Sequence, residues 1–87
     1  MKIVARPIDA IVVFKGNGHP LPYRFKFTAE NGEKTEISVE KILLVEEQRV
    51  AGKPSLVYDC QSRIGSCQRR YQLKYMIPDC RWVLYKI

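Results

Sequence analysis

Short runs of alternating apolar and polar residues, separated by turn-forming residues, recur along this chain. The segments 24–28 and 36–40 both alternate in this way, and Asn31-Gly32 stands between them. A period of two places apolar side chains on one face of a β-strand, and Asn-Gly tolerates the positive φ of a tight turn. We therefore expect a hairpin from about Leu21 to Val39 and a chain that folds mainly as β-structure.

Four further segments carry the same pattern or are rich in β-branched residues: 8–14, 56–60, 68–77 and 81–86. The connections between them contain Gly, Pro or Asp, which are typical of turns. Many short strands of this kind favour a small SH3-like barrel or sandwich of five to six antiparallel strands. With a length of 87 residues, we expect residues 1–87 to form a single domain.

The segment from Glu40 to Val50 has two interpretations. Ile42 and Leu44 alternate along the chain, and Val39-Glu40-Lys41-Ile42 suits a strand that continues past a bulge, so a bent strand is predicted. The spacing of Ile42, Leu43 and Val45 also suits one or two helical turns. We favour the strand, and a short helix near 40–48 is the alternative.

The register of the last hairpin decides which aromatic side chains meet water. A three-residue loop, Pro78 to Cys80, would direct Trp82 outwards beside the basic residues of segment 68–77. A four-residue loop, Pro78 to Arg81, would set Ile77 opposite Trp82. It would direct Trp82 into the core and Tyr85 outwards, because a slip of one residue exchanges the two faces of a strand. The sequence leaves both registers open.

The positive charge of the chain is confined to its second half. The first 48 residues contain seven Lys/Arg and seven Asp/Glu, whereas residues 49–87 contain eight Lys/Arg against Asp59 and Asp79, which gives the net charge of +6. Basic side chains interleaved with aromatic ones are typical of nucleic-acid-binding surfaces, because cations neutralise phosphates and aromatic faces accept unstacked bases. We therefore expect non-specific contact with DNA or RNA. The candidate residues are Arg63, Arg69, Arg70, Lys74, Arg81 and Lys86, with Trp82 or Tyr75 as the stacking partner.

A second function class is protein–protein interaction, with the basic charge incidental. Pro20 and Pro22 remove backbone donors beside the strand Leu21–Thr28, which makes this strand the expected edge of a sheet. An exposed edge can accept a strand from a partner or from a second copy. Contact with nucleic acid requires Arg69, Arg70, Lys74 and Lys86 in one contiguous patch. A dimerisation domain would instead show an apolar edge strand away from that patch.

Neither a metal site nor an enzyme is expected. Cys60, Cys67 and Cys80 are separated by six and twelve residues, unlike the closely paired ligands of structural zinc. His19, the single histidine, lies in a Gly/Pro-rich loop without a nucleophile motif. The sequence predicts no catalytic residue and no cofactor, and we expect the three cysteines to be free thiols.

The sequence also predicts a compartment. No apolar run approaches the roughly 18–20 residues of a membrane span. Residues 1–6 lack the arrangement of a secretory signal, and an odd number of cysteines argues against a disulfide framework. We expect a cytoplasmic protein that makes no contact with membranes.

One pattern of residues runs through several of these segments: Pro22-x-x-Phe25-x-Phe27, Ile37-x-Val39-x-x-Ile42, Tyr71-x-Leu73-x-Tyr75 and Trp82-x-Leu84. In outline, over roughly residues 20–87, it resembles the small SH3-like barrel found as a C-terminal tail of bacterial Y-family DNA polymerases or encoded beside them. The function of that family is uncharacterised. The resemblance implies a DNA-associated accessory role and assigns no functional residue.

Overall fold

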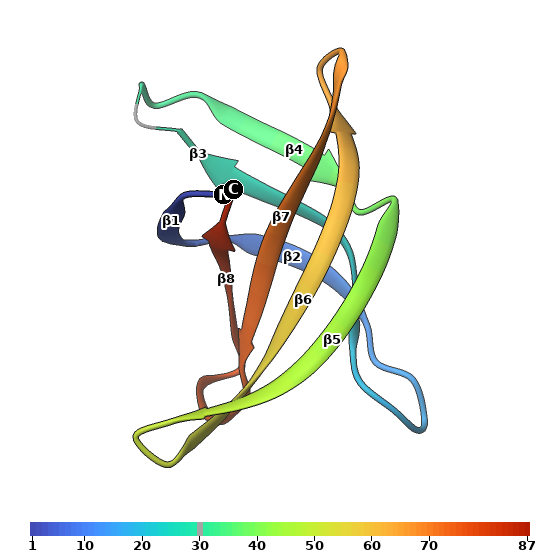
Figure 1. Cartoon of the computed structure of the whole chain (residues 1–87), viewed down its shortest axis with the longest axis vertical. Helices are drawn as coiled ribbons and strands as arrows, with labels where there is room; N and C mark the ends of the chain where they lie inside the picture. The colour runs from blue at the N-terminus through green and yellow to red at the C-terminus, as the bar shows by residue number, and fades with distance from the viewer. Residues whose placement is uncertain (30) are drawn as a thin grey trace.

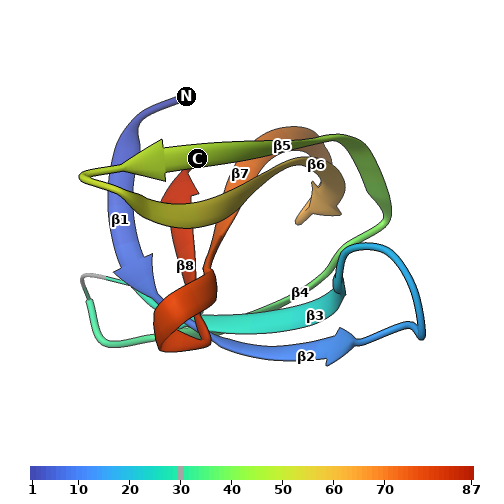
Figure 2. The same ribbon diagram turned by 90° about the horizontal axis from the view of Figure 1, so that it is seen from below.

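The computed structural model describes residues 1–29 and 31–87 and consists of two antiparallel sheets that face one another (Figures 1 and 2). The first sheet has five strands in the order β1-β8-β7-β6-β5, and the second has three in the order β2-β3-β4. Among the described residues no ladder of strand pairs joins the two sheets, so they do not form a closed barrel. The strands are β1 (Ile3–Pro7), β2 (Asp9–Val13), β3 (Leu21–Thr28), β4 (Lys34–Ser38), β5 (Lys41–Val50), β6 (Lys53–Ile64), β7 (Cys67–Met76) and β8 (Arg81–Lys86).

The mainly β fold is confirmed, but the expected number of five to six strands is wrong. Sequence analysis missed β1, which is a short edge strand that ends at Pro7 and pairs only with β8. It also treated β4 and β5 as one bent strand. In the structure the chain leaves the three-stranded sheet after Ser38 and enters the five-stranded sheet at Lys41.

Segment 40–48 is a strand, as favoured, and the alternative of a short helix is wrong. β5 pairs with β6 along its length, with an irregularity between Ile42 and Leu44. The bulge expected within residues 39–42 is instead the place at which the chain passes from one sheet to the other. Pairing with β6 decides the conformation here, because a strand in a sheet satisfies its backbone groups through its neighbour and not locally.

The expected hairpin of β3 and β4 is confirmed, with Gly32 at a φ of 86° in its turn. Asn31 supports the turn, because its side-chain oxygen accepts a hydrogen bond of 3.0 Å from the Glu33 backbone N–H. The expected edge position of Leu21–Thr28 is wrong. β3 lies between β2 and β4 in the sheet, and its Pro22 pairs with Val12 beside an irregularity in the pairing with β2.

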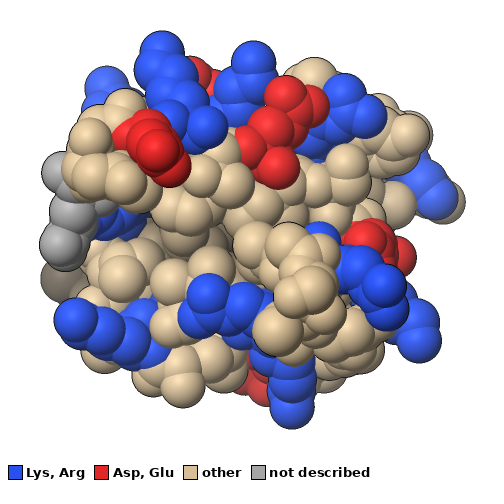
Figure 3. All heavy atoms as spheres, turned by 90° about the horizontal axis from the view of Figure 1, so that it is seen from above, with Lys and Arg blue, Asp and Glu red and all other residues tan. Residues whose placement is uncertain are grey.

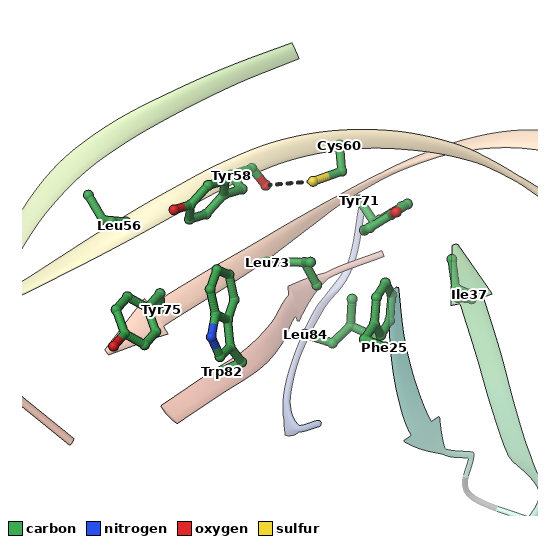
Figure 4. Close-up of a cluster of buried hydrophobic side chains, with 10 residues drawn as sticks. All are labelled: Phe25, Ile37, Leu56, Tyr58, Cys60, Tyr71, Leu73, Tyr75, Trp82 and Leu84. Atoms are coloured by element: carbon green, nitrogen blue, oxygen red, sulfur yellow. Dashed lines mark hydrogen bonds between the residues drawn. The ribbon is translucent and has the colours of Figure 1, made fainter. Parts of the chain in front are cut away.

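The core fills the space between the sheets and is largely aromatic (Figure 4). Tyr58 and Tyr71 are fully buried, and Phe25 from the other sheet packs against Tyr71 with ring centroids 5.5 Å apart. From Tyr71 to Tyr75, every second residue of β7 contributes to this core, so this part of the strand has one apolar and one polar face. The buried residues are Phe25, Ile37, Leu56, Tyr58, Cys60, Tyr71, Leu73, Tyr75, Trp82 and Leu84.

A buried hydroxyl group forms hydrogen bonds with the segment that connects the two sheets. Ser62 on β6 donates a hydrogen bond of 2.7 Å to the Ser38 carbonyl and accepts one of 3.1 Å from the Glu40 N–H. Its oxygen also lies 2.7 Å from the Tyr71 hydroxyl. The chain therefore bends from β4 to β5 around a side chain that satisfies the backbone groups at the bend.

Candidate nucleic-acid interface

The two central basic residues of the candidate interface lie on the outer face of β7. Tyr71, Leu73 and Tyr75 point into the core, and the residues that alternate with them point away from it. Arg70 is exposed and Lys74 is half-buried on this outer face. Local alternation in the sequence was enough to place both.

The connection between β7 and β8 settles the position of Trp82. Met76 pairs with Arg81 and Tyr75 with Trp82, so the connection consists of Ile77 to Cys80. Ile77–Asp79 form a single 3-10 turn, and Cys80 adopts a left-handed conformation with a φ of 51°. Neither loop weighed from the sequence has these boundaries. The expected four-residue loop set Ile77 opposite Trp82, which is two residues from the observed pairing. A shift of two residues leaves each side chain on the same face of its strand, so Trp82 points inwards and Tyr85 outwards, as in that alternative.

The assignment of Trp82 as an exposed stacking residue is wrong. Its side chain is only 8% exposed and stacks on Tyr75, with ring centroids 4.8 Å apart and an interplanar angle of 27° (Figure 4). Its ring centroid also lies 5.2 Å from that of Tyr58. Tyr75, the other candidate stacking residue, is buried as well. Both rings belong to the core and are not accessible to a nucleobase.

Tyr85 takes the position that sequence analysis gave to Trp82. The pairing of β7 with β8 shifts between Gln72 and Leu73, which pair with Lys86 and Leu84, so Tyr85 is the extra residue of a bulge. The Lys74 ammonium lies 4.3 Å from the centre of the Tyr85 ring, and the Lys86 ammonium lies 5.5 Å from it. In the sequence, only the alternative of a four-residue loop indicated that Tyr85 points outwards.

The hairpin of β6 and β7 separates the remaining two arginines. Arg63 follows the buried Ser62 and so lies on the outer face, and Arg70 pairs with Gln61 on the same face. Arg69 pairs with Ser62 and therefore lies on the opposite face of the hairpin, although it is exposed. We use the term basic strip for the outward-facing cations Arg63, Arg70, Lys74, Arg81 and Lys86; Arg69 is outside it.

Few acidic groups oppose the basic strip. Asp59 is next to it on β6, and its carboxylate accepts a hydrogen bond of 2.7 Å from the Gln72 side-chain amide. Within residues 1–29 and 31–87, the recorded ion pairs join Arg24 and Lys26 to Glu36 on the other sheet. The ammonium and guanidinium groups of the strip are therefore free of carboxylate partners among the described residues.

The positive charge is not uniform over the whole molecule. Seen from the end at which the β6–β7 hairpin and both chain termini lie, Lys and Arg side chains stand around the rim and Asp and Glu side chains interrupt them (Figure 3). The pairing of β6, β7 and β8 places the residues of the basic strip on these three strands. A surface of this form suits a narrow anionic ligand that follows one strand direction.

The cysteines are free thiols in two different environments. Cys60 is fully buried, and burial, with a smaller effect of the Asp59 charge, raises its pKa to about 12. Cys67 and Cys80 are exposed. No group of three His, Cys, Asp or Glu side chains in the described part of the chain is close enough to hold a metal ion.

The chain was compared with known proteins, and no family model, curated protein or solved structure matches it. The resemblance to the polymerase-associated tail domain therefore stays a prediction. No helix in the described segments is long and apolar enough to cross a membrane.

Proposed function

We propose that this protein is a non-catalytic binding domain whose basic strip contacts the phosphate backbone of DNA or RNA without sequence preference. The observation that carries the proposal is the convergence of Lys74 and Lys86, from neighbouring strands, on the Tyr85 ring. Lysines held against an aromatic ring lose less side-chain freedom when they bind a phosphate than freely moving lysines would.

The spacing of the strip supports an extended ligand. Arg70 and Lys74 are four residues apart on β7, which corresponds to about 13 Å along the strand. One strand of a nucleic acid carries a phosphate about every 3.4 Å of helix axis, so about four phosphates span this distance. Arg63 at one end and Arg81 at the other extend the same row of positive charge.

The proposal does not include recognition of particular bases. The described residues contain strands and one 3-10 turn, so no α-helix is presented that could enter a major groove. Contacts from Lys and Arg to phosphates position a ligand but carry no sequence information. Affinity should therefore fall steeply with salt and vary little with sequence.

The absence of catalysis is part of the proposal. His19, the single histidine of the chain, is exposed in the connection between β2 and β3, on the other sheet from the basic strip. The proposal also includes a cytoplasmic location, which suits free thiols because a reducing compartment preserves them. We further propose that the fold is an open variant of the SH3-like barrel, in which the β4–β5 bend carries the chain between the sheets.

Fluorescence anisotropy of labelled single- and double-stranded oligonucleotides tests the proposal at about 50 and 200 mM salt, where binding dominated by phosphate contacts changes steeply. We expect micromolar binding at the lower salt, at least a tenfold loss at the higher salt, and loss of binding in Arg70→Glu/Lys74→Glu. The matched control, Lys26→Glu/Lys34→Glu, makes the same change in charge on the other sheet and should bind about as well as the parent. Absence of binding at the lower salt, or equal losses in both double variants, would contradict the proposal.

A further inference from the structure

The unpaired edge of β2 carries large exposed apolar side chains. β2 is an outer strand of the three-stranded sheet and lies on the far side of β3 from β4 (Figure 2). Natural edge strands are usually protected by charge, proline or a covering element. Here Ile11 is 60% exposed, Val13 47% and the adjoining Phe14 66%. Along the chain, the nearest charges on either side are Asp9 and Lys15; on β3, Arg24 lies opposite Ile11 and Lys26 opposite Asp9.

The backbone groups of this edge point in a defined direction. The Ile8 N–H donates a hydrogen bond of 3.2 Å to the Trp82 carbonyl in β8, and Ile11 pairs with Arg24 in β3. Backbone groups of successive residues point to opposite sides of a strand. Those of Ala10, Val12 and Phe14 therefore point away from β3, on the same side as those of Ile8, where no strand in the described part of the chain pairs with them.

A groove runs beside this edge, with Asp9 and Arg81 at one end and a mainly apolar lining at the other. Two cavities of about 450 and 470 Å³ follow each other along β2, and both are lined by Ala10, Cys80 and Trp82. Val12 and Phe14 line the second cavity from β2, and Tyr75 lines it from β7. The Phe14 ring stands at the rim, with its centroid 6.3 Å from that of Tyr75.

We infer that β2 pairs with β2 of a second copy of this chain, antiparallel, about a two-fold axis at Val12. Val12 would then face the partner's Val12, and Ala10 would face the partner's Phe14. Both pairs consist of residues whose free backbone groups point towards the partner, as antiparallel hydrogen bonding requires. The two three-stranded sheets would form one six-stranded sheet across the dimer.

Charge complementarity selects this register. About an axis at Val12, Asp9 faces the partner's Lys15 and Lys15 faces the partner's Asp9, so opposite charges meet at both ends. An axis at Ile11 would leave the same backbone groups facing the partner but would set Asp9 against the partner's Val13. Opposite charges across strands are favourable, and a two-fold axis repeats each such pair.

The same register gives the exposed apolar side chains a partner. Ile11 lies opposite the partner's Val13, which is a pair of β-branched residues on the outer face. Phe14 lies beside the partner's Ala10, at the groove over the partner's Trp82. Each copy therefore supplies one groove and one aromatic side chain that fits it, as an isologous interface requires.

Sedimentation and light scattering over a range of concentrations test the inference. We expect the mass to rise from 10.1 kDa towards twice that value. Asp9→Lys and Lys15→Asp should each raise the dimer Kd about tenfold, because each places like charges opposite one another at both ends. The combined Asp9→Lys/Lys15→Asp should restore dimerisation, since it exchanges the two charges. A double variant as weak as the single ones would contradict the register.

Cross-linking provides a second readout that does not depend on affinity. In a Cys67→Ser/Cys80→Ser background, Val12→Cys should form a disulfide-linked dimer, because facing residues of a hydrogen-bonded pair have Cα atoms about 5.5 Å apart. Ala10→Cys is the matched control and should not, since the two Ala10 positions would lie about 13 Å apart along the strands.

Two outcomes would overturn the inference. One is a monomer at every concentration up to about 1 mM, because even a weak dimer would be detected at that concentration. The groove would then be explained as a binding site for an extended segment of another protein. The other is a dimer in which Val12→Cys and Ala10→Cys cross-link equally. Circular dichroism of each variant checks that it folds. Neither outcome bears on the central residues of the basic strip, Arg70, Lys74 and Lys86, which lie on the other sheet and do not line the groove.

Discussion

Lys74 on β7 holds its ammonium group 4.3 Å from the centre of the Tyr85 ring on β8. The two residues meet because the bulge in β8 adds one residue opposite Gln72 and brings Tyr85 and Lys86 to the same place on the outer face. An aromatic ring that contacts two cations can orient both of them for a phosphate.

The first prediction concerns this ring. Tyr85→Leu should weaken oligonucleotide binding about three- to tenfold, because part of its two cation–π contacts, each about 0.5–1 kcal/mol at exposed sites, serves to orient the lysines for the phosphate. Tyr85→Phe keeps the ring and should bind like the parent. Anisotropy titrations at about 50 mM salt, where phosphate contacts are strong, measure both. A larger loss for single than for double strands would add base stacking to the role of the ring, and equal binding by all three proteins would show that the ring plays no part.

The second prediction concerns the buried hydroxyl at the bend between the sheets. Ser62→Ala leaves the Glu40 N–H, the Ser38 carbonyl and the Tyr71 hydroxyl without their recorded partner. Unsatisfied buried polar groups cost about 1–3 kcal/mol each, so the free energy of unfolding should fall by at least about 2 kcal/mol.

Urea unfolding followed by circular dichroism measures this change. Ser55→Ala is the matched control, since Ser55 is also buried but makes only a 3.5 Å contact with the Gln48 carbonyl. Similar losses in the two variants would mean that the hydrogen bonds of Ser62 add nothing beyond the packing of a buried serine.

The third prediction follows from the position of Trp82 in the core. Trp82→Ala removes the stacking on Tyr75 and the contact with Tyr58, and should lower the free energy of unfolding by about 3–5 kcal/mol. Tyr23→Ala removes an aromatic side chain that is 60% exposed and should change it by less than about 1 kcal/mol. Chemical unfolding of both variants distinguishes a core residue from a surface one. A mild effect at Trp82 would return it to the candidate binding residues.

The fourth prediction concerns alkaline pH. Burial is the main cause that raises the pKa of Cys60, Tyr58 and Tyr71 to about 12, above ordinary values of 9.0 for the thiol and 10.0 for the phenols. The folded protein therefore holds these protons more tightly than the unfolded chain does. Their contribution to stability is complete below pH 9 and is lost as the pH rises from 9 towards 12.

Urea midpoints measured between pH 8 and 11, across the range where these groups titrate, test this loss. Cys60→Val removes the thiol, so the decline should begin nearer pH 10, the ordinary pKa of the two tyrosines. Cys80→Ser is the control, because Cys80 is exposed and the substitution should leave the onset unchanged. An onset that is the same in all three proteins would contradict a role for the buried thiol.

The β7 strand was predictable because its alternation is local. Arg70 and Lys74 are separated by residues of strongly different polarity, so a period of two placed both on the outer face without knowledge of a partner strand. β8 was not predictable to the same extent. Its sequence is apolar on both faces, so whether Trp82 or Tyr85 points outwards depends on how many residues the β7–β8 connection contains and on a bulge.

The position of each strand in its sheet could not be predicted from the sequence either. The prolines beside β3 indicated an edge, yet β3 is central because β2 and β4 pair with its two sides. Proline removes one backbone donor, but which side of a strand remains open depends on all the strands that reach it. For the same reason the apolar edge of β2 and its groove became visible only in the folded chain.

The sequence alone determined that this chain forms antiparallel strands, that its net positive charge lies in residues 49–87, and that its turns fall at residues such as Gly32. These properties depend on neighbours along the chain: the period of side chains, the sum of charges and the φ that a residue tolerates. The tertiary structure decided which cations share a face, which aromatic ring they meet and which edge stays unpaired. Those properties depend on register between distant strands, where a shift of one residue exchanges the core face for the surface.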